Sequence, residues 1–164
     1  IIGLPNAGKS SLLASLTSAT PKIANYKFTT LNPNLGVAIY DDKEITLADI
    51  PGLIEGAHKG TGLGIKFLKH IERCKVLLHL IDISEKNLVN SYSQVREEMA
   101  KYSSELLKKQ EIIVFNKTDL VDEEEKNKKI NEFHEIIKKP TFKTSTLDKK
   151  SVSDIKSKLL NYVS

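Results

Sequence analysis

The stretch "IIGLPNAGKSSLL", residues 1–13, decides the fold class that we expect for this chain of 164 residues. Its two isoleucines read as the end of a strand, and Gly3–Ser10 fits the pattern G-x-x-x-x-G-K-[S/T]. A loop of this kind between a strand and a helix presents backbone N–H groups to phosphate oxygens. Lys9 adds a positive charge at the β and γ phosphates, and Ser10 offers a hydroxyl group to Mg²⁺. The stretch therefore predicts a nucleotide-phosphate site on an α/β fold.

The composition is typical of a soluble globular protein with one domain, because 40% of the residues are hydrophobic and 28% are charged. No apolar run approaches the roughly 20 residues that span a bilayer, so no membrane span is expected. The single cysteine, Cys74, excludes an internal disulfide framework and favours a cytoplasmic location. The net charge of +4 is compatible with a nucleic-acid-rich partner, although solvated lysines on helix faces explain it more simply.

Apolar runs alternate with amphipathic stretches, which predicts an α/β sheet covered by helices on both faces. "VLLHLID" and "IIVF" read as buried central strands, whereas "GVAIYDDKEITLAD" reads as a hairpin, so we expect a mixed sheet with one antiparallel strand at an edge. The expected strands are Ile1–Ile2, Leu35–Tyr40, Glu44–Ala48, Val76–Ile81, Ile112–Phe115 and a weak strand near Phe142. The expected helices are Lys9–Ser18, Gly64–Arg73, about Lys86–Lys109, Asp122–Lys138 and Ser151–Tyr162. Because a first strand of two residues is too short, we expect residues 1–164 to be a single domain cut from a longer protein.

Two polar segments follow predicted strands in the order that a nucleotide site needs. "ITLADIPG" ends in Asp49, whose carboxylate can hold Mg²⁺ through water, while the N–H of Gly52 approaches the γ-phosphate. "IIVFNKTD" ends in Asp119, an acceptor-only side chain that matches the N1–H and 2-amino donors of guanine, a pair that adenine lacks. The stem of Lys117 can cover the base, and Asn116 can tie this loop to the phosphate loop. The segments therefore predict a guanine nucleotide as the ligand.

A third segment, "KTSTLD" at Lys143–Asp148, follows the weak strand near Phe142. The Ser145–Thr146 backbone there could contact the guanine oxygen, and a plain loop is the alternative.

Four stretches together resemble the Obg family of translation-factor-related GTPases: "GLPNAGKSSLL", "YKFTTLNPNLGV", "DIPGLIEGAHKGTGLGIKFLKHIERCKVLLHLID" and "NKTD". The resemblance implies a Ras-like P-loop G domain with a six-stranded, mainly parallel sheet. It makes "YKFTTLN" the first switch, with Thr30 as the second protein ligand of Mg²⁺ beside Ser10, and "DIPGLIEGAHKGTGLG" the second switch. It also implies that the parent protein acts in large ribosomal subunit assembly, through that subunit or its RNA, and in stress signalling.

The site residues expected from the motifs and the resemblance fall into three groups. The nucleotide contacts are Gly3, Asn6, Ala7, Gly8, Lys9, Ser10, Ser11, Phe28, Thr29, Thr30, Asp49, Gly52, Asn116, Lys117, Asp119, Ser145, Thr146 and Leu147. The metal ligands are Ser10, Thr30 and Asp49, the last through water. The residues expected to assist hydrolysis are Asn6, Thr30 and Gly52.

Leu53 stands where many GTPases carry a glutamine that orients the attacking water, and its side chain can neither donate nor accept a hydrogen bond. Three substitutes are open: a polar residue of the second switch such as Glu55 or His58, a potassium ion near Asn6, or a partner such as the ribosome. The potassium hypothesis rests on similarity to cation-dependent GTPases that share Pro-Asn in the loop, and its alternative is that Asn6 only shapes the loop. Slow intrinsic hydrolysis is therefore expected.

Two other functions compete with a GTP-hydrolysing switch. One is a binding module that senses GDP or guanosine tetraphosphate and hydrolyses GTP only incidentally. The other is an ATPase of the related YchF type, which lacks the guanine-reading carboxylate, so Asp119 argues against it. The isolated domain is expected to be a monomer.

Overall fold

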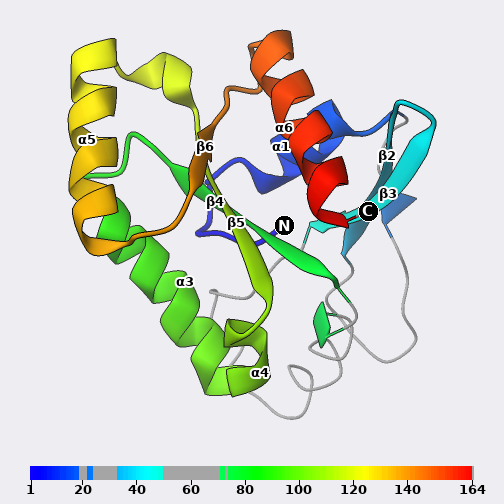
Figure 1. Ribbon diagram of the computed structural model, residues 1–164, viewed down its shortest axis with the longest axis horizontal. Helices are drawn as coiled ribbons and strands as arrows, with labels where there is room; N and C mark the ends of the chain where they lie inside the picture. Colours follow the sequence, from blue (N-terminus) through cyan, green and yellow to red (C-terminus); the bar gives the residue numbers. More distant parts are fainter. Residues whose placement is uncertain (19–21, 24–32, 50–70, 73, 164) are drawn as a thin grey trace.

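The computed structural model describes residues 1–18, 22–23, 33–49, 71–72 and 74–163. Helices and strands alternate along most of the chain, as the sequence pattern predicts (Figure 1). The strands are β1 Lys22–Ile23, β2 Asn34–Tyr40, β3 Lys43–Asp49, β4 Val76–Asp82, β5 Gln110–Asn116 and β6 Thr141–Lys143. The helices are α1 Lys9–Leu16, α3 Leu88–Tyr102, α4 Ser104–Leu107, α5 Glu123–Ile136 and α6 Lys149–Val163, with a 3₁₀ turn at Thr118–Leu120.

The strands form two groups of three, in the orders β1-β2-β3 and β4-β5-β6. The first group is antiparallel and the second is parallel. Ile1 and Ile2 lie between the groups: Ile2 pairs in parallel with His79 of β4, and the nitrogen of Ile1 donates to the carbonyl oxygen of Ala48 in β3. This short segment carries the chain from the sheet directly into the glycine-rich loop.

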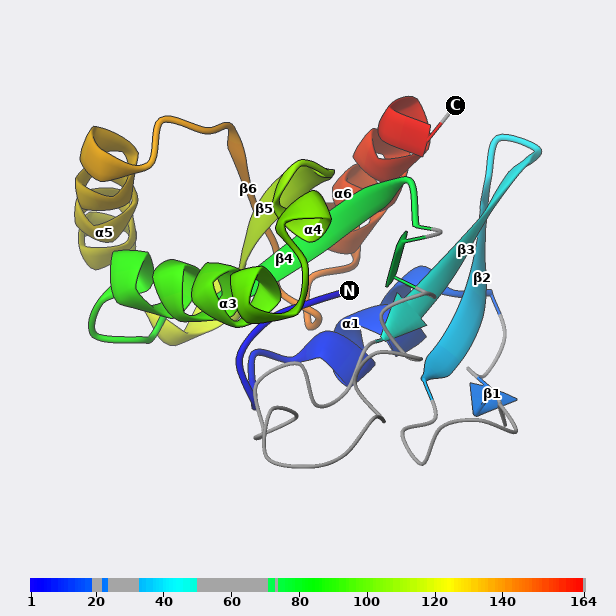
Figure 2. The same ribbon diagram turned by 90° about the horizontal axis from the view of Figure 1, so that it is seen from below.

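The two faces of the parallel strands are covered by different helices, because successive side chains of a strand point to opposite faces. Leu78 and Leu80 of β4 join a core cluster with α1 and α6, whereas Ile81 joins a cluster with α3 and α5. Figure 1 shows α1 and α6 on one side of β4 and β5, with α3 and α5 on the other, and Figure 2 shows the β2–β3 hairpin extending beside α1. The predicted α/β class with helices on both faces is confirmed.

A buried polar network fastens α3 to the parallel strands. Glu111 of β5 accepts hydrogen bonds from the hydroxyl of Tyr92 at 3.1 Å and from the ammonium of Lys139 at 2.8 Å, and it lies 2.9 Å from Nδ1 of His79. Burial raises the pKa of this carboxyl, but its hydrogen bonds with His79 and Lys139 outweigh burial and hold the pKa at about 2. Burial also lowers the pKa of His79. Arg96 adds a further contact with the same carboxylate at 3.4 Å.

Several details differ from the sequence prediction, and most helices and strands begin or end one or two residues from their predicted bounds. The helix expected over Lys86–Lys109 is broken, because Ser103 has an extended backbone and its hydroxyl caps the short helix α4. The six named strands include β1, which was not predicted, whereas Ile1–Ile2 makes only a single bridge. Strand β2 begins one residue before its predicted start and ends at Tyr40 as predicted, whereas β3 extends one residue beyond both of its predicted ends, so that Asp49 closes it.

The helix expected over Gly64–Arg73 lies largely outside the described residues. Within that range the structure describes only Ile71 and Glu72, and both are helical. Among the helices that the structure describes, none is long and apolar enough to cross a membrane.

Candidate nucleotide-binding site

The glycine-rich loop wraps tightly between Ile2 and α1. Asn6 and Gly8 both have a left-handed backbone, with φ of 64° and 92°. At Gly8, an added Cβ would lie only 2.4 Å from Nδ2 of Asn116, so the loop needs glycine for space as well as for conformation. Gly8 is also the N-cap of α1 and offers no capping side chain, and the first turn of α1 has no acidic residue. The helix therefore begins with backbone N–H groups suited to an anion.

Lys9 reaches back over the loop that precedes it. Its ammonium donates to the carbonyl oxygens of Gly3 at 3.1 Å and Leu4 at 3.0 Å. An ammonium carries three donors on a flexible stem, so the group is held close to the loop and can also face a phosphate.

An open hollow of about 410 Å³ lies beside the loop. Its lining combines the phosphate loop with the segment after β5, namely Asn6, Gly8, Lys9, Ser10, Ser11 and Lys117. All six were singled out from the sequence as nucleotide contacts, and the fold brings them to one place.

The predicted metal ligands Ser10 and Asp49 meet at the end of β3. The hydroxyl of Ser10 donates to Oδ2 of Asp49 at 2.5 Å. Asp49 is 3% exposed, and its Oδ1 is buried without a hydrogen-bond partner among the described residues. A buried carboxylate oxygen that lacks a donor, next to a hydroxyl group, fits the oxygen ligands that Mg²⁺ prefers.

Asn116 joins the two halves of the candidate site. Its Nδ2 donates to the carbonyl oxygen of Ala7 at 2.9 Å, in a contact that is fully buried. Asn116 closes β5 and Ala7 belongs to the phosphate loop, so the bond spans 109 residues of sequence. The predicted tie between the two loops is therefore present in the structure.

The loops after β5 and β6 are also joined. The hydroxyl of Ser145 donates to Oδ1 of Asp119 at 2.5 Å, and the N–H and hydroxyl of Thr118 both donate to the carbonyl oxygen of Thr144. The N–H of Ser145 is bonded to the hydroxyl of Ser151, at 3.0 Å. Thr146 is half-buried beside them and Leu147 is exposed, so the fold places all of the predicted base-side residues on adjacent loops.

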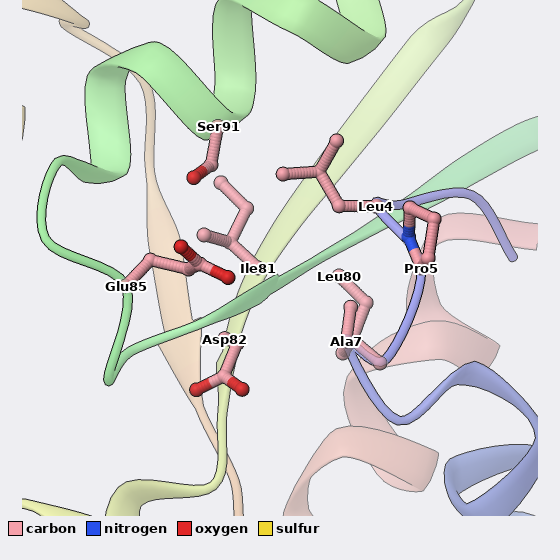
Figure 3. A pocket seen from close by; sticks show the side chains of 8 residues that line it. All are labelled: Leu4, Pro5, Ala7, Leu80, Ile81, Asp82, Glu85 and Ser91. Atoms are coloured by element: carbon pink, nitrogen blue, oxygen red, sulfur yellow. The ribbon is translucent and has the colours of Figure 1, made fainter. Parts of the chain in front are cut away.

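Asp82 contacts one of the predicted site residues and was not itself singled out from the sequence. It closes β4, as Asp49 closes β3 and Asn116 closes β5, and its Oδ2 lies 2.6 Å from the ammonium of Lys117. Figure 3 shows Asp82 at the end of β4, across from Ala7 of the phosphate loop. The sequence signal that could have pointed to Asp82 is its position at the end of a predicted strand, because ligand sites gather at the carboxyl ends of parallel strands.

The remaining predicted residues lie outside the part of the chain that the structure describes. They are Phe28, Thr29 and Thr30 of the first switch, and Gly52, Leu53, Glu55 and His58 of the second.

The protein family described as "50S ribosome-binding GTPase" matches residues 1–117 of this chain. A relative from Pelagibacter ubique, named GTPase Obg, is 68% identical over 164 residues, which is 100% of this chain and 50% of that protein. GTPase Obg from Rickettsia massiliae is 54% identical over 155 residues, 94% of this chain and 47% of that protein. The chain thus spans about half the length of the curated relatives it matches.

Solved structures share the fold at low sequence identity. The G domain of the T. maritima FeoB iron transporter matches with a TM-score of 0.69 and 22% identity, over 99% of this chain and 95% of that one. Elongation factor SelB from Methanococcus maripaludis, in complex with a GTP analogue, matches with a TM-score of 0.67 and 17% identity, over 99% of this chain and 32% of that one. These likenesses confirm the predicted G-domain fold.

The family model matches more than half of the chain. The two relatives of high identity are both named GTPase Obg, and each aligns with almost the whole chain. The chain belongs to the family of 50S ribosome-binding GTPases, and the predicted resemblance to the Obg proteins is confirmed.

Proposed function

We propose that residues 1–164 form one G domain that binds GTP with Mg²⁺ and hydrolyses it slowly, as the switch of a protein acting in large ribosomal subunit assembly and in the stress response. The buried bond from Asn116 to Ala7 is the observation that carries the proposal. This bond holds a loop suited to guanine next to a loop suited to phosphates. A single guanine nucleotide would contact both loops, with its base on one and its phosphates on the other.

On the phosphate side, the N–H groups of Gly8, Lys9 and Ser10 at the start of α1 would face the phosphate oxygens. The ammonium of Lys9 would balance their charge. Gly3, Asn6 and Ala7 shape this loop, and Ser11 would add contacts on the side of the α-phosphate.

Ser10 and Asp49 would hold Mg²⁺, the latter through water, and Thr30 would be the further protein ligand. When bound, Mg²⁺ would neutralise part of the negative charge of the phosphates. Oδ1 of Asp49 supports this assignment, because it has no hydrogen-bond partner in the described part of the chain and a buried carboxylate oxygen needs a donor or a cation nearby.

On the base side, Asp119 would accept the two adjacent donors of guanine, and the hydroxyl of Ser145 would hold that carboxylate in place. The N–H of Ser145 is bonded to Ser151, so we assign the contact with the guanine oxygen to the backbone of Thr146. The stem of Lys117 would cover one face of the base. Phe28, Thr29 and Leu147 are proposed as contacts at the edges of the nucleotide.

Hydrolysis would rely on the N–H of Gly52 and on Thr30 near the γ-phosphate, with no help from the apolar side chain of Leu53. We propose that Asn6, exposed in the loop, receives a potassium ion that supplies positive charge there. Without a partner, the expected rate is on the order of 10⁻⁴ s⁻¹, as for other unassisted GTPases.

The role in ribosome assembly draws on the description of the matched family, and the mildly basic charge of +4 suits a partner rich in RNA. We further propose that the domain is cytoplasmic and monomeric.

A competition titration tests the proposal. Labelled GDP is displaced by GDP, GTP, ATP or guanosine tetraphosphate, and phosphate release from GTP is then followed with and without large ribosomal subunits. We expect the guanine nucleotides to compete, ATP to fail, and ribosomal subunits to accelerate release. Tight binding of guanosine tetraphosphate, with no acceleration, would favour the sensing module instead. Competition by ATP, or turnover above about 1 s⁻¹ without a partner, would contradict the proposal.

A further inference from the structure

We propose that Asp82 is a positioning residue for nucleotide recognition, which holds the side chain of Lys117 across the base site through an ion pair. The inference rests on the proposed function and adds to it a residue that lies outside the known GTPase motifs of the chain.

The carboxylate of Asp82 is held at both oxygens. Oδ1 accepts the N–H of Ser84 at 2.9 Å and the hydroxyl of Ser84 at 2.7 Å, while Oδ2 lies 2.6 Å from the ammonium of Lys117. Burial raises the pKa of Asp82, but the hydrogen bonds from Lys117 and Ser84 outweigh it and leave the pKa below its ordinary value. The carboxylate is therefore a fixed, charged anchor at the end of β4.

Lys117 needs such an anchor because its stem is long and its backbone is unusual. Its φ of 60° and ψ of 38° lie in the left-handed region, where a residue other than glycine requires support from its surroundings. An unanchored lysine samples many rotamers, and ordering it on binding weakens affinity. The ion pair orders the side chain before a nucleotide arrives.

The anchored stem lies where a base-side contact is expected. Its Cε is 3.9 Å from the position that a Cβ of Gly8 would occupy, and Lys117 lines the hollow together with the phosphate loop. The side chain of Lys117 is 31% exposed and that of Asp82 is 11% exposed, so one face of the stem stays open. The apolar part of an anchored lysine can then cover a flat ring.

The location of Asp82 distinguishes it from an ordinary charged residue on the surface. Figure 3 shows Asp82 and Glu85 as two carboxylates near the end of β4, of which Asp82 is buried and Glu85 is exposed. Only Asp82 has an ion pair with a residue of the NKTD segment among the described residues. Glu85→Gln is therefore a matched control for removing a negative charge from this end of the strand.

A double-mutant cycle tests the inference. Asp82→Asn keeps the shape and an acceptor for Ser84 but loses the charge, and Lys117→Met keeps an apolar stem without the ammonium. We expect Asp82→Asn to raise the Kd for labelled GDP about five- to tenfold, and Glu85→Gln to change it less than twofold. In the Lys117→Met background, Asp82→Asn should change the Kd less than twofold, because the partner of the carboxylate is gone.

Urea unfolding without nucleotide and circular dichroism establish that each variant is folded, and Asp82→Glu, which keeps the charge, should recover part of the lost affinity. The inference is overturned if Asp82→Asn binds GDP like the unmodified chain. It is also overturned if Asp82→Asn weakens binding equally with and without the ammonium of Lys117, since that result indicates a general structural effect. Failure of the unmodified chain to bind GDP would instead refute the proposed function.

Discussion

Replacing Asn116 by alanine removes the one buried hydrogen bond that joins the base-side and phosphate-side loops among the described residues. Ala7 is 2% exposed, so its carbonyl oxygen loses a donor without gaining water. An unsatisfied buried acceptor costs about 1–3 kcal/mol. The middle of that range, about 2 kcal/mol, corresponds to a roughly 30-fold change in an equilibrium constant.

We expect this loss to appear first in stability. For a domain of this size, about 2 kcal/mol lowers Tm by roughly 4–8 °C. We also expect the Kd for GDP to rise at least about tenfold, because binding must then order two loops that are no longer held together. Thermal unfolding and urea unfolding without nucleotide measure the change in Tm and in the free energy of unfolding, and fluorescence titration with labelled GDP measures the change in Kd.

Asn131→Ala is the matched control, since it removes the same atoms from an exposed position on α5. Its expected effect is within about 0.5 kcal/mol, as for most surface substitutions. If Asn116→Ala matches this control in both stability and affinity, the bond to Ala7 does not organise the site and the reasoning is refuted.

Three other perturbations probe separate parts of the account. Ser10→Ala should raise the Mg²⁺ concentration needed for half-maximal GTP binding at least about tenfold, while Ser15→Ala on the same helix should leave it unchanged; equal effects would remove Ser10 from the metal site. Potassium should accelerate GTP hydrolysis relative to sodium, and Asn6→Ala should abolish the difference; equal rates in the two salts would exclude the ion. The folded-state pKa of Glu111 is about 2, below its ordinary 4.5, so its contribution to stability is present above about pH 4.5 and is lost as the pH falls toward 2. Glu111→Gln should therefore flatten the fall of unfolding free energy between pH 5 and 2, and an unchanged slope would contradict the assignment.

The sequence predicts the parallel strands well because their signal is local. "VLLHLID" and "IIVF" are continuous apolar runs, and both become buried strands. The break at Ser103 is harder to predict, because the apolar stripe continues through it and only the capping hydroxyl marks the new helix. Strand β1 has two exposed residues and exists through its pairing with β2, so no periodic pattern could indicate it.

The site shows the same division between local and tertiary information. Each loop could be recognised from its own residues, and even the tie from Asn116 to the phosphate loop could be foreseen. The end of a predicted strand marks the position of Asp82, but its ion pair could not be predicted, because its partner Lys117 follows the neighbouring strand and the pair exists only when β4 and β5 lie side by side. The engagement of the Ser145 N–H by Ser151 of α6 is equally invisible in the sequence.

The most direct test of the central claim is the base preference of the chain and of Asp119→Asn. Nucleotide competition is measured with GDP, XDP and ADP against a labelled nucleotide. The unmodified chain should prefer GDP. The variant should lose affinity for GDP and gain affinity for xanthosine diphosphate (XDP), since an amide can donate to the oxygen that xanthine carries in place of the 2-amino group. An unmodified chain that binds ADP as well as GDP, or an Asp119→Asn variant with an unaltered preference for GDP, would contradict the account.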